Sequence, residues 1–128
     1  MDWFLGFLVN MANKLGLEMS IVLQVSGFLI AGTLVSGPKY FERFASDFAR
    51  EWPNKATADM IQEAFSQYGE IYKNTGDDLS QPATYIHLEN ARFFHHGGKP
   101  IPMNHGIWWR GRLSEVSGFF MGSISHEG

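Results

Sequence analysis

The chain contains no cysteine, which excludes disulfide bonds and thiol catalysis and fits a protein of a reducing compartment. It also lacks an excess of positive charge: charged residues make up 18% of the chain, and the formal net charge is −3 at pH 7. Such a chain has no general electrostatic attraction to nucleic acid or to anionic membranes. We therefore expect a cytoplasmic protein for which nucleic acid is a disfavoured partner.

Long hydrophobic runs are also missing. The apolar run Trp3 to Val9 is far shorter than the roughly 20 residues that a membrane-spanning helix needs. Asp2 stands where a signal peptide would carry positive charge, and no small-residue cleavage site follows. The sequence predicts no membrane span. It predicts instead a short amphipathic helix that packs onto the protein's own sheet.

Hydrophobic residues, at 45% of 128 residues, are numerous enough to form one core, and we expect a single domain over residues 1–128. Alternating apolar and polar residues predict five antiparallel strands at about 17–26, 28–36, 84–94, 106–113 and 116–125. Residues 2–15, 38–52 and 57–73 show helical spacing instead. The predicted fold is an α+β domain with an N-terminal helix and a strongly bent five-stranded sheet. A two-helix insertion at about 38–75 follows the second strand.

Local signals refine this outline. Gly32 inside the second strand predicts a bend or a bulge, and the alternation changes phase after Asn90, which predicts a bulge in the third strand. The polar segment 74–82, NTGDDLSQP, is expected to be a disordered loop. His87 alternates with core positions of its strand and is expected to be a histidine of the sheet surface.

The densest group of histidines lies between His95 and His105, in the stretch HHGGKPIPMNH. Neutral imidazoles are common zinc and nickel ligands, so His95, His96 and His105 are candidates for a metal site. However, adjacent histidines of an extended strand point to opposite sides, and the loop contains no carboxylate. Its glycines and prolines are typical of a turn. We expect a mobile hairpin connection without a specific metal.

An outward row of large side chains is predicted on the fourth strand, at Trp108, Arg110 and Arg112. Tryptophan and arginine are frequent anchors of protein interfaces. The same trio could stack on single-stranded RNA, or the inserted helices could cover it. We expect a partner-binding surface or a covered surface in preference to an RNA site. No phosphate loop, nucleophile elbow or paired carboxylate spacing occurs, and we expect a protein without catalytic residues or a cofactor.

Several segments together resemble a known family. They are Ile30 to Thr33 in the hairpin, Tyr40-Phe41, Ile86 to Asn90 (IHLEN), Trp109 to Arg112 (WRGR) and Gly118 to Ser125 (GFFMGSIS). This ordered set, over most of residues 17–125, is similar to the gas vesicle accessory protein GvpU family, with Ala31 where serine is usual. The resemblance implies a non-enzymatic cytoplasmic protein, associated with gas vesicles, that binds shell or other accessory proteins. It leaves a homo-oligomer open.

A second resemblance concerns the fold. A leading helix, the hairpin LQVSGFLIAGTLVS, HLENA and HGIWWRG are together similar to the Sm-like small barrel, and Arg110-Gly111 matches the Arg-Gly of its second motif. RNA-binding members have an asparagine near the start of the third strand, and none stands at Thr84-Tyr85. The barrel architecture is therefore implied without its RNA pocket, and an Sm-like RNA-binding module is the alternative function.

Overall fold

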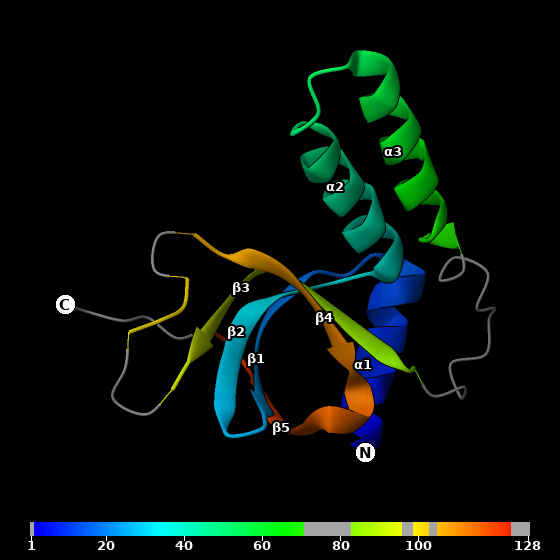
Figure 1. The fold of residues 1–128 in the computed structure, drawn as a ribbon. Helices are drawn as coiled ribbons and strands as arrows, with labels where there is room; N and C mark the ends of the chain where they lie inside the picture. The colour runs from blue at the N-terminus through cyan, green and yellow to red at the C-terminus, as the bar shows by residue number, and fades with distance from the viewer. Residues whose placement is uncertain (1, 71–82, 96–98, 103–104, 124–128) are drawn as a thin grey trace.

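The computed structural model describes residues 2–70, 83–95, 99–102 and 105–123. These residues form three α-helices and five strands, arranged as in Figure 1. In chain order the elements are α1 (Trp3–Leu15), β1 (Met19–Val25), β2 (Phe28–Val35), α2 (Gly37–Ala49), α3 (Lys55–Gln67), β3 (Tyr85–Phe94), β4 (Ile107–Arg112) and β5 (Val116–Met121). A one-turn 3₁₀ helix, Leu113–Glu115, joins β4 to β5.

All strand pairs are antiparallel, and the strand order is β4-β3-β2-β1-β5. The pairing of β3 with both β2 and β4 shifts register at Asn90, where β3 has one extra residue, so the bulge predicted in the third strand is confirmed. Gly32 lies opposite this bulge and keeps a regular pairing with Ile21 of β1. Asn90 takes a positive φ of 54°. In the described residues no ladder joins β4 to β5, so the sheet is not closed. The α+β class and the antiparallel sheet are confirmed, and the Sm-like barrel stays a hypothesis.

Helix α1 closes the core of the domain. Asp2 begins the helix by accepting hydrogen bonds from the amides of Phe4 and Leu5, and Gly16 ends it in the left-handed conformation. Its buried face packs against the inward side chains of β1, β2, β3 and β5 and of the turn between β4 and β5. Together these residues form one hydrophobic cluster. The fully enclosed members of this cluster are Leu5, Val9, Ala12, Ile21, Leu23, Ile30, Leu34, Ile86, Leu88, Ala91 and Leu113.

Helices α2 and α3 form a hairpin that projects from one end of the sheet (Figure 1). Ser36 and Asn54 cap their first turns through their side-chain oxygens. On α2, three rings at helical spacing stack on one another: Tyr40 on Phe44, and Phe44 on Phe48. Phe65 of α3 packs against the last two of these rings, at centroid distances of 6.2 and 5.3 Å. Aromatic packing between the helices therefore holds the hairpin together.

Most element boundaries agree with the sequence prediction within a few residues. The sequence predicts that the third helix reaches residue 73, but α3 ends at Gln67, and residues 71–73 lie outside the described part of the chain. Two differences are physical. Helix α2 ends at Ala49 rather than at residue 52, because the chain turns before Pro53, whose ring prevents helix in the residue before it. Helix α3 begins at Lys55, since Asn54 supplies the cap. The segment predicted to be disordered, 74–82, lies outside the described residues.

Candidate interaction site

The face of the sheet opposite α1 carries the side chains on which α2 sits. His87 projects from this face of β3, but it is only 1% exposed, so the expectation of a surface histidine is wrong. The physical reason is a contact between distant parts of the chain. The rings of Tyr40 and Phe41 cover the imidazole, with centroids 4.8 and 5.8 Å away.

Arg110 of β4, an exposed residue, contacts this buried cluster from its edge. Its Nε donates a hydrogen bond to His87 Nε2 at 3.1 Å, and its guanidinium carbon lies 3.7 Å from the centroid of the Tyr85 ring. Because arginine can only donate, Nε2 must be the acceptor, and the proton of the neutral ring is on Nδ1. Burial, together with the positive charge of Arg110, lowers the pKa of His87 to about 3. The imidazole is therefore neutral near pH 7.

Trp108 also contacts α2. Its Nε1 donates to Asp47 Oδ2 at 2.8 Å, and its ring meets Tyr40 edge-on with centroids 5.7 Å apart. The side chain is half-buried, whereas Arg112, two residues further from Arg110 on the same face of β4, is exposed. The structure thus brings Trp108 and Arg110 together beneath α2 and places Arg112 outside that contact. A role of these three residues in binding a partner stays a prediction.

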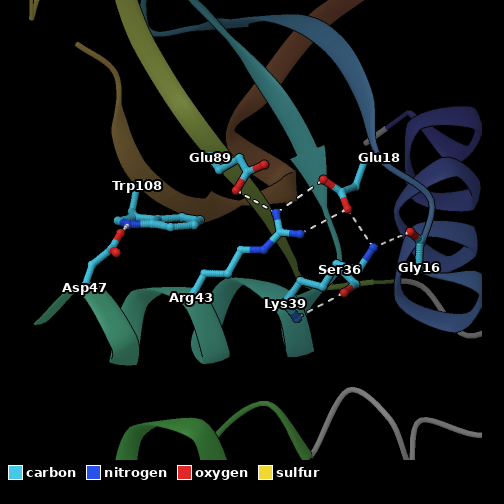
Figure 2. A network of polar contacts seen from close by, with 8 residues as sticks. All are labelled: Gly16, Glu18, Ser36, Lys39, Arg43, Asp47, Glu89 and Trp108. Atoms are coloured by element: carbon cyan, nitrogen blue, oxygen red, sulfur yellow. Dashed lines mark hydrogen bonds and ion pairs between the residues drawn. The ribbon is translucent and has the colours of Figure 1, made fainter. Parts of the chain in front are cut away.

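An ion-pair network, drawn in Figure 2, fixes α2 beside the same face of the sheet. Arg43 contacts Glu89 of β3 at 2.8 Å and Glu18, just before β1, at 3.3 Å. Lys39, one turn earlier, contacts Glu18 at 2.6 Å and donates to the carbonyl of Gly16 at 2.8 Å. Two cations of one helix face therefore match two carboxylates of the sheet and tie α2 to the end of α1.

The pKa values follow these contacts. Hydrogen bonds from Lys39, and then from Arg43, lower the pKa of Glu18 below its usual value. The hydrogen bond to Glu89 raises the pKa of Arg43. Sequence reasoning did not anticipate this network, because its partners are 21 to 46 residues apart. A signal was present, however: two basic residues four positions apart on α2 faced two outward carboxylates of predicted strands.

A second surface is apolar and lies where α1 meets the edge strand β5. Trp3 is 79% exposed and Phe4 46% exposed, and their rings are in contact with centroids 5.7 Å apart. Phe4 reaches Phe119 of β5, with centroids 6.1 Å apart, and Met121 follows on the same face of that strand. With the exposed Phe7 of α1, these side chains are called the α1–β5 surface below.

The histidine loop is partly described. The middle of the loop is tied to β3, since Phe93 and Ile101 exchange backbone hydrogen bonds of 2.7 and 2.8 Å. His95 and His105 are exposed, whereas His96 lies outside the described residues. Within the described part of the chain, no three side chains of His, Asp or Glu gather as a metal site would require. The expected mobility of the loop and its lack of a specific metal both stay predictions.

Among the described residues, no helix has both the length and the hydrophobicity to cross a membrane. Comparison with known proteins finds no match among curated proteins or among solved structures. A family model described as gas vesicle protein GvpU-like matches residues 2–124. That range includes α1, both faces of the sheet and the α2–α3 hairpin, so the match covers every element described above. The chain therefore belongs to the GvpU-like family of gas vesicle proteins.

Proposed function

We propose that this gas vesicle protein is a non-enzymatic, cytoplasmic accessory protein that binds shell or other accessory proteins through the α1–β5 surface. Family membership supports the gas vesicle context. The α1–β5 surface is the observation that carries the binding role, because it gathers exposed aromatic rings beside a strand edge. Trp3, Phe4 and Phe7 leave much of their area in water although their helix has a fully buried opposite face.

Two physical properties suit this surface to a protein partner. Burying apolar area against a partner gains about 25 cal/mol per Å², and Trp and Phe bring the largest areas of any side chain. Besides, β5 is at the edge of the sheet and pairs only with β1 in the described residues. Its outer backbone groups can accept a further strand. The exposed apolar side chains and the outer strand edge lie on the same side of the molecule. This combination favours a protein as the binding partner over RNA or a small metabolite.

The outward row Trp108, Arg110 and Arg112 is the second candidate surface. Its first two side chains contact Asp47, Tyr85 and His87 within the chain, so a partner would meet only the parts that these contacts leave exposed. Arg110 and Arg112 are both exposed, and Arg110 is already engaged in these contacts. For this reason the α1–β5 surface ranks first.

Co-flotation with purified gas vesicles tests the proposal, because buoyant vesicles carry bound protein to the surface of the solution. The double variant Trp3→Ser/Phe7→Ser should lose most of the floating fraction and should keep the melting temperature of the parent. Met60→Ser is the matched control, since Met60 is 71% exposed on α3, far from this surface along the chain. Full flotation of the double variant would contradict the assignment to α1–β5. Loss on Arg112→Ala alone would place the binding surface on β4.

The alternative, an Sm-like RNA-binding module, is tested with the same protein. We expect short U-rich or A-rich RNA to bind no tighter than the non-specific level at physiological salt, because a chain of net charge −3 lacks the phosphate attraction that such binding uses. Micromolar binding that disappears in Arg110→Ala/Arg112→Ala would favour the alternative. A sedimentation measurement on the same samples decides whether a homo-oligomer forms.

A further inference from the structure

A polar cavity lies on the outer face of the sheet, away from both surfaces considered above. It has a volume of about 210 Å³, and its lining comes from β1, β2, β3 and the residues after β5. The lining residues are Ser20, Ala31, Gly32, Thr33, Asn90, Arg92, Phe94 and Ser123. Since one water molecule occupies roughly 30 Å³ in the liquid, the space is large enough for a small organic group.

The fold creates this cavity at the bulge of β3. The bulge at Asn90 lies opposite Gly32 of β2 and shifts the pairing of β3 with both of its neighbours. The bulge turns Arg92, which would otherwise face the core, onto the outer face opposite Ala31. Helix α2 covers the His87 end of this face, and the cavity lies beyond it. A bulge that redirects a charged side chain is a frequent arrangement near binding sites.

Arg92 has unmet hydrogen-bonding capacity at this point. Its Nε is buried and has no hydrogen-bond partner among the described residues, although a guanidinium is charged at every physiological pH. The nearest carboxylate along the strand, that of Glu89, is already held by Arg43 at 2.8 Å. A charged group with an unmet donor is costly, and the partly buried Arg92 lines the cavity, so an acceptor that enters the cavity beside its guanidinium is favoured.

We infer that this cavity binds a carboxylate group through Arg92, with the hydroxyls of Thr33 and Ser20 as further donors. A carboxylate matches the planar fork of a guanidinium and accepts its N–H groups in pairs. A single arginine also balances a single negative charge, whereas a phosphate dianion would leave net negative charge in the cavity. The carboxylate comes either from a free organic acid or from an acidic side chain of a protein, and both sources present the same group.

The Nε–Hε signal of Arg92 in a ¹H–¹⁵N spectrum tests this inference on the full chain, because it reports on the buried donor itself. Propionate, added at constant ionic strength against sodium chloride, should shift this signal to saturation in the millimolar range. Inorganic phosphate should bind more weakly than propionate. A shift that never saturates, one that chloride reproduces, or tighter binding of phosphate would overturn the inference.

Two cavity variants, one control variant and one pair of peptides complete the design. Thr33→Val keeps the shape of the side chain, removes only the hydroxyl, and should weaken propionate binding several-fold. Arg92→Gln should weaken it at least tenfold, measured on backbone amides of the cavity, while Arg112→Gln should leave it unchanged. If Arg92→Gln does not fold, Thr33→Val alone decides, and unchanged affinity there counts against the site. A blocked Gly-Glu-Gly peptide is compared with propionate and with blocked Gly-Gln-Gly. Tighter binding of Gly-Glu-Gly than of both others identifies an acidic side chain of a protein as the source of the carboxylate. Tighter binding of propionate than of Gly-Glu-Gly identifies a free organic acid.

Discussion

The buried imidazole of His87 makes the stability of the fold depend on pH. Its pKa is about 3 in the folded chain and near 6.5 when unfolded, so between these values the unfolded state binds more protons. The free energy of unfolding therefore falls as pH falls, by up to about 1.4 kcal/mol per pH unit. We expect the parent to lose about 2 kcal/mol from this residue between about pH 7 and about pH 5, measured by urea unfolding.

A neutral replacement isolates this contribution. His87→Gln retains an acceptor for Arg110 and cannot be protonated, so its stability should vary much less over the same pH range. The lowered pKa of Glu18 acts below its ordinary value of 4.5, outside this window. His105→Gln, at an exposed position, serves as the control and should follow the parent. Equal pH dependence in His87→Gln and the parent would show that the imidazole is not the titrating group.

Gly32 is needed because β2 and β3 approach closely at the bulge. A Cβ at this position would lie 3.1 Å from the Glu89 carbonyl oxygen and 3.2 Å from the Ala91 Cα, and both are backbone atoms that cannot rotate away. We expect Gly32→Ala to destabilise the domain by about 1–3 kcal/mol, as overpacking commonly does. Gly118→Ala is the control, because its Cβ would meet only Gln24 Oε1 at an ordinary 3.5 Å. Thermal unfolding of the two variants should differ clearly, and equal melting temperatures would contradict this account.

At the scale of single elements, Trp108 holds α2 against β4. Trp108→Phe removes the hydrogen bond to Asp47, which is exposed and contributes little, but retains a ring beside Tyr40. Trp108→Ala removes both, and we expect it to cost about 1–3 kcal/mol because the ring is half-buried. The phenylalanine variant should lose less than about 1 kcal/mol. Similar losses in both variants would mean that the hydrogen bond, and not ring packing, is what counts.

How far the sequence could predict these elements depends on the range of the interaction. Strand alternation and helical spacing are local properties, so the five strands, the three helices and the bulge at Asn90 could be predicted directly. The burial of His87 could not, because α2 covers it from more than 40 residues away along the chain. Alternation likewise predicted that the Trp108 side chain points away from the core. It could not predict the contact with Asp47, which is distant along the chain.

At the scale of the whole molecule, stability should be distributed unevenly. The central strands β1, β2 and β3 contribute most of the fully buried residues, whereas α3 has no buried residue and touches the rest mainly through α2. Regions with few buried contacts open locally without global unfolding. We therefore expect amide hydrogens of α3 to exchange much faster than those of β2, with exchange of β2 limited by unfolding of the entire domain.

The variant Phe65→Ala tests whether α3 opens independently of the sheet, because Phe65 packs α3 against the stacked rings of α2. The variant should speed exchange throughout α3 by at least tenfold while changing β2 exchange far less, since its effect is confined to the hairpin. Leu88→Ala, in the middle of the core, should instead speed exchange in all elements together, with a cost of about 2–5 kcal/mol. If α3 exchanged as slowly as β2 in the parent, the hairpin and the sheet would unfold as one unit. In that case the contacts of Arg43, Trp108 and Arg110 with α2 would contribute to global stability in addition to positioning the helix.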